Sequence, residues 1–203
     1  MALTDSPSDI DVASMGGRDR ILLRAAQLFL ENGYAETSLR TIADAVEMRP
    51  ASIYHHFESK DALLTEILAI GIDAVATAFD AVAAELAADV DGKSRLAAHV
   101  AGHLDALFAH HAFTATHVTI FPFVPDLVRA SAIDDRDRYE AKWTALLEDL
   151  VPGLDHDGLR LTRLALFGAM NSTVQWFDPA AGSLIGLADA LVATLWNGLK
   201  EVT

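Results

Sequence analysis

Apolar residues recur every three or four positions along most of the chain, which is the spacing of one face of an α-helix. The first such run covers residues 21–29 and ends at Asn32-Gly33, a pair that commonly stops helices. Few stretches alternate between apolar and polar residues as half-buried strands do, and no internal repeat is visible. The pattern predicts an all-α protein of about nine helices.

Two short helices are expected after the first. Ser38 can cap one over residues 39–46, and Pro50 suits the first turn of another over 50–56. Asp61 then begins a longer helix with a continuous apolar face. Three short helices followed by a long one form a compact N-terminal head.

The chain divides into a disordered tail over residues 1–17, the head over 18–64 and a helical body over 65–203. Further helices of the body are expected at residues 96–108, 136–151, 159–177 and 184–199, with a break at 121–125. The acidic pair Asp134-Asp135 could hold a cation together with Asp137, but the start of the helix over 136–151 explains these acids more simply.

Composition narrows the classes of protein that fit. Hydrophobic residues make up 52% of the 203 positions, enough to bury a sizeable core. Cysteine is absent, which excludes disulfides, thiolate nucleophiles and cysteine-bound metals. The net charge of −14 argues against unspecific coating of nucleic acid.

The charge is distributed unevenly along the chain. Residues 18–60 hold six basic and six acidic side chains, whereas residues 61–203 hold nine basic and twenty acidic ones, a net charge of −11. A neutral head on an acidic body is compatible with DNA binding through one face of the head.

Nothing in the sequence favours export or a membrane span. The N-terminal segment lacks the basic and apolar regions of a signal peptide. The most apolar span, Leu68 to Val90, contains four acidic side chains, each costly at the centre of a bilayer. We expect a buried helix of a cytoplasmic protein that has no membrane partner.

Residues 18–64 have the layout of a helix-turn-helix, in which the third short helix presents small, hydroxyl and basic side chains. A helix that enters the major groove needs small residues at its leading end and donors near phosphates and base edges. Ile53 and Phe57 would face back into the core. Lys60 precedes the long helix, whose free N–H groups could hold a phosphate together with its ammonium.

Residues 37–45 and 52–64, TSLRTIADA and SIYHHFESKDALL, closely resemble the DNA-binding head of the TetR family of transcriptional repressors. The resemblance implies a homodimer whose heads bind a palindromic operator and whose body binds a small effector that releases the DNA. The expected contacts to the DNA backbone are Ser38, Arg40, Thr41, Tyr54, His55 and Lys60, and the residues expected to read bases are Arg49, Ala51 and Ser52.

One position departs from the family pattern. Where the family often has glycine in the turn between the second and third helices, this chain has Glu47. The glutamate must either adopt a positive φ at some cost or reshape the turn.

Side chains of the middle helices could line an apolar effector pocket with a few polar groups, as ligand sites usually have. They are Phe108, Phe113, His117, Phe121, Phe123 and Trp143. Packing in an unliganded core is an alternative for each of them. Residues 168–179 are similar to a helix of TetR proteins that often respond to acyl-CoA, fatty-acid or steroid-derived ligands, although Gln175 replaces their common arginine. This similarity implies a small apolar or acyl-type effector.

His99 and His103 are four residues apart, the minimal spacing for two metal ligands on one helix. No HExxH motif accompanies them, so a surface or pocket-lining pair is the simpler interpretation. We expect neither a metal nor a cofactor.

Small residues around Gly168 and Ser172, mixed with large apolar ones, suit close helix contact across a two-fold axis. Phosphate-binding glycine loops and a GxSxG motif are absent, so we do not expect an enzyme. The sequence therefore predicts a dimeric, ligand-responsive repressor. An activator, a DNA-binding regulator without a ligand, and an all-α enzyme or carrier with a vestigial head remain as alternatives.

Overall fold

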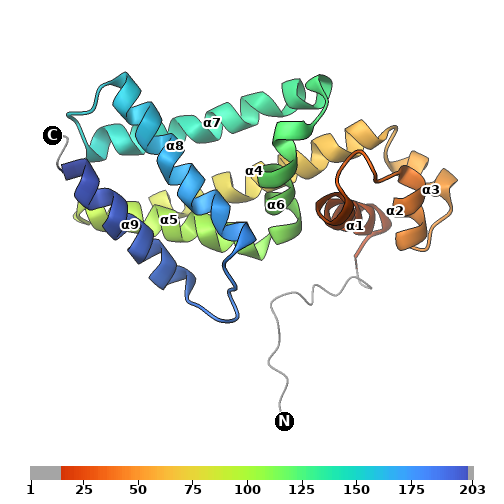
Figure 1. Ribbon diagram of the computed structural model, residues 1–203, viewed down its shortest axis with the longest axis horizontal. Helices are drawn as coiled ribbons and strands as arrows, with labels where there is room; N and C mark the ends of the chain where they lie inside the picture. Colours follow the sequence, from red (N-terminus) through yellow and green to blue (C-terminus); the bar gives the residue numbers. More distant parts are fainter. Residues whose placement is uncertain (1–14, 201–203) are drawn as a thin grey trace, which may run out of the picture. The chain divides into compact units, whose positions relative to one another are not determined.

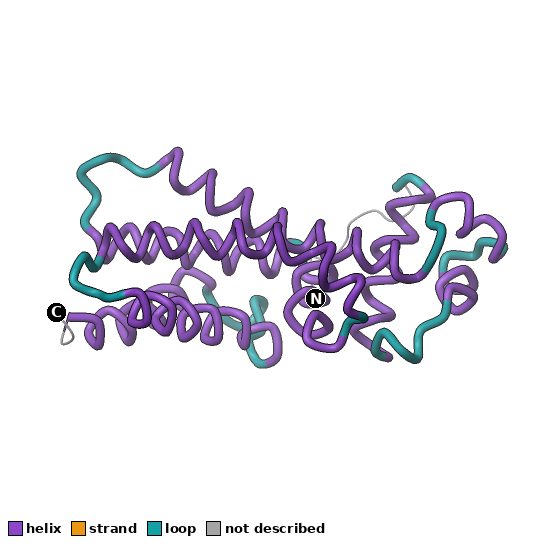
Figure 2. The backbone as a smooth tube through the Cα atoms, turned by 90° about the horizontal axis from the view of Figure 1, so that it is seen from above, coloured by secondary structure: helices purple, strands orange, loops and turns teal. Residues whose placement is uncertain are grey.

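The computed structural model describes residues 15–200, with side chains as far as residue 198, and most of the predicted tail lies outside this range. Over the described residues the chain forms nine α-helices and two short 3-10 helices, without a strand (Figure 1, Figure 2). The predicted all-α fold is therefore confirmed. The first helix begins at Gly17, just inside the predicted tail.

The nine α-helices are α1 (Gly17–Asn32), α2 (Leu39–Ala45), α3 (Pro50–His56), α4 (Lys60–Glu85), α5 (Gly92–Ala109), α6 (His111–Ile120), α7 (Asp126–Leu150), α8 (His156–Ser172) and α9 (Leu184–Lys200). The 3-10 helices are η1 (Phe121–Phe123) and η2 (Thr173–Gln175).

The chain packs into two compact units. Of the described residues, unit 1 comprises 15–71 and 109–133, and unit 2 comprises 72–108 and 134–200. Unit 1 thus unites α1, α2 and α3 with the first part of α4, all of α6 and the first turns of α7. The expected boundary of a DNA-binding head at residue 64 concerns function and stays a prediction.

One hydrophobic core holds the N-terminal helices together. Phe29 of α1, Ile42 of α2 and Ile53 of α3 are fully buried, and Phe57 after α3 is 3% exposed. The prediction that Ile53 and Phe57 face the core is confirmed. α1 ends as predicted because Gly33 adopts φ +84° and its N–H donates to the Phe29 carbonyl at 2.9 Å.

α6 belongs to unit 1 because it contacts both α1 and α4. The buried Thr116 hydroxyl lies 3.2 Å from the Ala26 carbonyl of α1. His117 Nδ1 lies 3.1 Å from the Leu68 carbonyl of α4. α4 approaches so closely that a Cβ on Gly71 would lie 2.6 Å from the Phe113 carbonyl oxygen, so only glycine fits there.

α4 is the one helix among residues 15–200 that is long and apolar enough to cross a membrane. Length and composition are weak evidence, because a core helix passes the same test. Four of its aliphatic side chains are fully buried in the core of unit 1, namely Leu63, Leu64, Ile67 and Leu68. These contacts are those of a core helix. The helix ends at Glu85 and does not continue to Val90 as the apolar pattern suggested.

α7 begins at Asp126 rather than near residue 136. Pro125 starts the helix, since its carbonyl accepts the Arg129 N–H at 3.0 Å, and Asp126 places an acid in the first turn. Asp134-Asp135 lies inside α7, where Asp135 forms an ion pair with Arg138. The interpretation of this acidic pair as a helix start was therefore wrong.

The turn between α2 and α3 keeps a helix-ending geometry although glycine is missing. Glu47 adopts φ +57°. The Met48 N–H donates to the Ala43 carbonyl at 2.9 Å and the Glu47 N–H to the Asp44 carbonyl at 3.2 Å, the two bonds of a Schellman motif. Of the two outcomes expected at Glu47, the chain adopts the positive φ.

Replacing Glu47 by glycine is expected to stabilise the protein by about 1 kcal/mol. The substitution removes the strain of a side chain in the left-handed region, which costs about 1–2 kcal/mol. Part of this gain is lost because glycine gives the unfolded chain more conformational freedom. Urea unfolding followed by circular dichroism measures the change. Glu47→Gln is the matched control, since it removes the charge and keeps the strained backbone. Equal stability of the two variants would contradict the backbone explanation.

Candidate functional site

The first part of the candidate site is the exposed N-terminal end of α2. The Ser38 hydroxyl caps this helix by accepting the Thr41 N–H at 3.1 Å and lies 2.8 Å from the Thr41 hydroxyl. Ser38, Arg40 and Thr41 are all exposed. The cap therefore presents two hydroxyls and a guanidinium to solvent on one helix end.

α3 has two faces. Its apolar side buries Ile53, whereas the next residue, Tyr54, is 59% exposed, and Ala51 and His55 are exposed as well. Arg49 is the N-cap residue, whose carbonyl accepts the Ser52 N–H at 2.8 Å. The helix thus presents small and polar side chains outward, as the sequence predicted.

Arg40 and Arg49 are exposed cations without an ion-pair partner among the described residues. A guanidinium that is not engaged by a carboxylate keeps all five N–H donors for phosphate oxygens or base edges. The α2–α3 surface therefore has the charges that binding to an anionic partner requires.

Lys60 has a structural contact that the sequence did not indicate. It is the first residue of α4, and its ammonium donates to the Tyr34 carbonyl at 2.8 Å and lies 4.1 Å from the centre of the Tyr34 ring. The Tyr34 hydroxyl donates to the Asp61 carboxylate, and burial together with this bond raises the pKa of Tyr34. The ammonium has three N–H groups, so a phosphate contact by Lys60 stays a prediction.

The residues predicted to line an effector pocket fall into both units. Phe113, His117, Phe121 and Phe123 belong to unit 1, and Phe108 and Trp143 belong to unit 2. The Phe121 ring stacks on His117 with 5.2 Å between centroids and is buried, whereas Phe123 is 79% exposed. Successive side chains of the short 3-10 helix point in different directions, which the sequence pattern did not reveal.

In unit 2, Phe108 pairs with Phe177 at 5.8 Å between ring centroids, and Trp143 lies fully buried among other rings. We call Trp143 and the rings around it the His99 cluster. Its members come from α4, α5, α7 and α8 and are Phe79, His99, His103, Tyr139, Trp143 and Phe167. Trp143 is the one residue of the predicted pocket that belongs to it.

His103 joins three helices by hydrogen bonds. Its Nδ1 lies 2.7 Å from the Tyr139 hydroxyl of α7, and its Nε2 lies 3.2 Å from the Asn171 side-chain oxygen of α8. A neutral ring satisfies both contacts when Nε2 carries the proton and Nδ1 accepts from Tyr139. Burial lowers the pKa of His103 to about 4 and raises the pKa of Tyr139, so both groups are uncharged at neutral pH.

His99 lies one turn before His103 on α5 and is 3% exposed. It stacks on Phe79 with 4.2 Å between ring centroids, and its Nδ1 is buried without a hydrogen-bond partner among the described residues. Burial, together with the positive charge of Arg95, lowers the pKa of His99 to about 4. The pair is thus not on the surface but inside unit 2.

The metal interpretation of this pair has no further ligand to support it. Groups of three or more His, Cys, Asp or Glu side chains that could hold a metal do not occur among the described residues. Both ring nitrogens of His103 are already engaged in hydrogen bonds.

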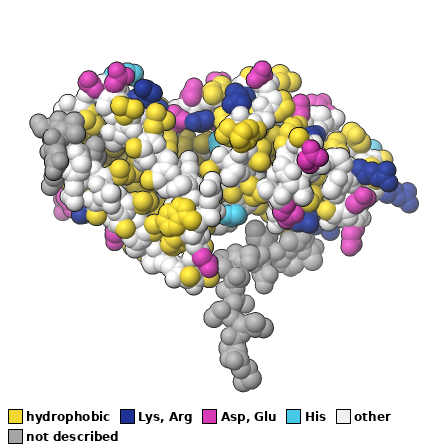
Figure 3. Space-filling model, in the orientation of Figure 1, with side chains coloured by type: hydrophobic (Ala, Val, Ile, Leu, Met, Phe, Trp, Pro, Cys, Tyr) yellow, Lys and Arg dark blue, Asp and Glu magenta, His cyan; other side chains and the backbone are white. Residues whose placement is uncertain are grey.

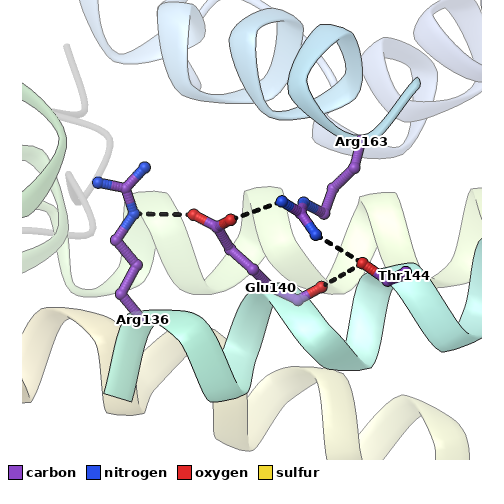
Figure 4. A network of polar contacts seen from close by, with 4 residues as sticks. All are labelled: Arg136, Glu140, Thr144 and Arg163. Atoms are coloured by element: carbon purple, nitrogen blue, oxygen red, sulfur yellow. Dashed lines mark hydrogen bonds and ion pairs between the residues drawn. The ribbon is translucent and has the colours of Figure 1, made fainter. Parts of the chain in front are cut away.

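A groove of about 380 Å³ runs along α7 and α8 in unit 2. In it, Glu140 accepts Arg163 Nη2 at 2.9 Å and Arg136 Nε at 2.8 Å, while Arg163 Nη1 donates to the Thr144 hydroxyl at 2.6 Å (Figure 4). The Glu140 carboxylate is shared by two guanidinium groups, and its ion pair with Arg163 links the two helices. We therefore assign this network to the packing of unit 2.

The two buried histidines should make the protein less stable in acid. Their pKa values of about 4 lie below the ordinary 6.5, so between these pH values the unfolded chain binds protons that the folded chain does not. The free energy of unfolding should fall as the pH drops from 6.5 towards 4, by at most about 1.4 kcal/mol per pH unit for each histidine.

Urea unfolding between neutral and acidic pH measures this loss. His99→Leu should flatten the profile relative to the unsubstituted protein. The carboxylates contribute equally to the pH dependence of both proteins, so the difference between the two profiles reports on His99. His156→Leu, which changes an exposed histidine of α8, is the matched control and should leave the profile unaltered. Parallel profiles for all three proteins would contradict the assignment of neutral buried histidines.

Comparison with known proteins gives the fold a family. A sequence model described as "Bacterial regulatory proteins, tetR family" matches residues 21–67, and one described as "Tetracyclin repressor-like, C-terminal domain" matches residues 89–199. The transcriptional repressor KstR2 of Rhodococcus jostii is 28% identical over 158 residues, which cover 78% of this chain and 72% of KstR2.

Solved structures agree with these matches. PfmR, a TetR family transcriptional regulator from Thermus thermophilus, is 28% identical, with a TM-score of 0.72 over 87% of this chain and 97% of PfmR. AibR, solved in complex with isovaleryl coenzyme A and operator DNA, has the same fold at 22% identity, with a TM-score of 0.74 over 87% of this chain and 96% of AibR. The second sequence model alone spans more than half of the chain, which therefore belongs to the tetR family of bacterial regulatory proteins.

Proposed function

We propose that this protein is a ligand-responsive transcriptional repressor that binds a palindromic operator as a homodimer. The observation that carries the proposal is the two-sided α2–α3 pair. Ile42 and Ile53 are fully buried on one side, and on the other the exposed cations Arg40 and Arg49 have no ion-pair partner within residues 15–200. The pair lies within the matched residues 21–67, and the relative KstR2 is named a repressor. A repressor of this kind acts in the cytoplasm, where bacterial DNA lies.

The roles on DNA follow from the side chains. At the start of α3, Arg49, Ala51 and Ser52 read base edges in the major groove, where small residues allow close approach and a guanidinium can bind a guanine by two bonds. The remaining contacts go to phosphates and set the register of the protein on the duplex. They are made by Ser38, Arg40, Thr41, Tyr54, His55 and Lys60.

The homodimer forms through an exposed apolar surface of unit 2. Leu161 and Leu164 of α8 are 58% and 43% exposed, and a Cβ added to Gly168, one turn further along the same face, would meet no atom within 4 Å. Ile185 of α9 is 68% exposed. Apolar side chains gather over α8 and α9 on the face seen in Figure 3. A monomer gains by burying such a surface against a second copy.

A small apolar or acyl-type effector binds the body and favours a conformation in which the two recognition helices no longer fit the operator. In the DNA-bound state these helices lie about 34 Å apart, one turn of DNA. To reverse a 99:1 preference for that state, the effector needs about 5.5 kcal/mol of differential affinity. α4 is continuous from Lys60 to Glu85 and contributes residues to both units, so a change in its course affects both.

Arg49→Ala should weaken operator binding by about 1–3 kcal/mol, because it removes a base contact, and should relax the sequence preference at one position of each half-site. Fluorescence anisotropy with a duplex selected by the unsubstituted protein from genomic fragments measures the loss. Arg138→Ala removes an exposed arginine of α7 and is the matched control, expected to bind normally. Normal binding by the Arg49 variant would remove this residue from the interface.

Leu164→Glu should convert the dimer into a monomer, because a buried unpaired carboxylate at the interface is costly. Light scattering after size-exclusion chromatography should show a mass of one 21.8 kDa chain for this variant and of two for the unsubstituted protein. Ala84→Glu adds the same charge to an exposed position of α4 and should stay dimeric. A Leu164 variant that remains dimeric would place the interface elsewhere.

A further inference from the structure

His99 is a polar side chain in an apolar place. It is 3% exposed, it stacks on Phe79, and its ring centre lies 6.2 Å from that of Trp143. Its Nδ1 has no hydrogen-bond partner among the described residues. A buried polar atom without a partner destabilises a fold, and leucine would fill a similar volume without this cost. Such an atom calls for a partner from outside the chain.

Three neighbouring polar side chains differ from His99 in this respect. His103, Tyr139 and Asn171 are already linked to one another by bonds of 2.7 and 3.2 Å. His99 Nδ1 and Trp143 Nε1 are therefore the hydrogen-bonding atoms of the cluster that lack a partner among the described residues. Of the two, only the histidine nitrogen can accept as well as donate. The walls of the cluster are otherwise aromatic. Apolar walls with a few fixed polar groups are the usual composition of a small-molecule site.

The charge of the surroundings restricts the ligand. All members of the His99 cluster are uncharged at neutral pH, since burial holds the pKa values of both histidines at about 4. Arg95 is a cation one turn away from His99 on α5, and its guanidinium donates to Asp149 at 2.6 Å. A carboxylate or phosphate in the cluster would lose its hydration without a cation in exchange.

α8 provides the rim of the cluster. Phe167 and Asn171 are only half-buried, whereas His99, Tyr139 and Trp143 are buried. A molecule that enters the cluster from the side of α8 lies close to Asn171 and to the hydrogen bonds of His103. It would thus act on the hydrogen bonds that join α5, α7 and α8.

We propose that the His99 cluster binds an uncharged molecule with an apolar ring body, whose hydroxyl or carbonyl group forms a hydrogen bond with His99 Nδ1. The proposal rests on the proposed ligand response and narrows it: the part of the effector that enters unit 2 carries an uncharged oxygen. If Nδ1 lacks the proton it accepts from a hydroxyl, and if it carries the proton it donates to a carbonyl.

Isothermal titration of the full chain with 2-naphthol and 2-naphthoate tests the proposal, since the two probes share a ring body and differ in charge. The protein should bind 2-naphthol, and 2-naphthoate at least tenfold more weakly. His99→Leu should weaken 2-naphthol binding about fivefold, as expected for one lost hydrogen bond. His99→Gln, which keeps a polar side chain, should recover part of the affinity, and His156→Leu is the matched control on the surface.

Three results would overturn the proposal: no binding of 2-naphthol at 1 mM, equal binding of the two probes, or unaltered binding by His99→Leu together with His99→Gln. Operator release is measured separately by anisotropy. Binding of 2-naphthol without release of the operator would support the site and contradict the proposed ligand response. Absence of operator binding would contradict the repressor function and leave the titration result valid.

Discussion

The shared core of unit 1 is the constraint on which the proposed DNA-binding surface of α2 and α3 depends. α2 and α3 have seven residues each, far below the length at which an isolated helix is stable in water. They persist because Ile42 and Ile53 are completely buried with Phe29 and with the first turns of α4. Because the buried face stabilises α3, the exposed polar side chains of this helix are available for binding.

The same core also links the N-terminal helices to a later part of the chain. α6 is distant in sequence, yet the buried Thr116 hydroxyl and His117 attach it to α1 and α4, and Gly71 permits backbone contact that any side chain would block. A displacement of α6 must therefore alter the packing of the helices that support α2 and α3. Densely packed elements of this kind move between discrete arrangements rather than by continuous deformation.

Unit 2 contains polar side chains in two different environments, one on its surface and one in its interior. On the α7–α8 surface, Glu140 forms ion pairs with two arginines, and all three side chains keep some exposure to water. Inside, His103 remains uncharged, because desolvation outweighs the hydrogen bond to Asn171 that favours the charged ring. His99 fits neither arrangement, and for this reason it marks a site in our proposal.

Helix type and number, the end of α1 at Gly33, the extent of α3 and the outward position of Tyr54 could be read from the amino-acid order. These features depend on local periodicity, caps and turn residues, and the family motif in residues 37–64 indicated the kind of surface. The positive φ of Glu47 was also one of two outcomes that the turn chemistry allowed.

Tertiary contacts decided the rest. Ring positions over residues 108–143 follow from packing between helices that are distant in sequence, so Phe123 proved exposed and Trp143 joined histidines that the pattern had treated separately. Likewise, the engagement of Lys60 by Tyr34 and the unpaired Nδ1 of His99 require knowledge of neighbours that no helical period specifies, because a hydrogen bond depends on distances in space and not on spacing along the chain.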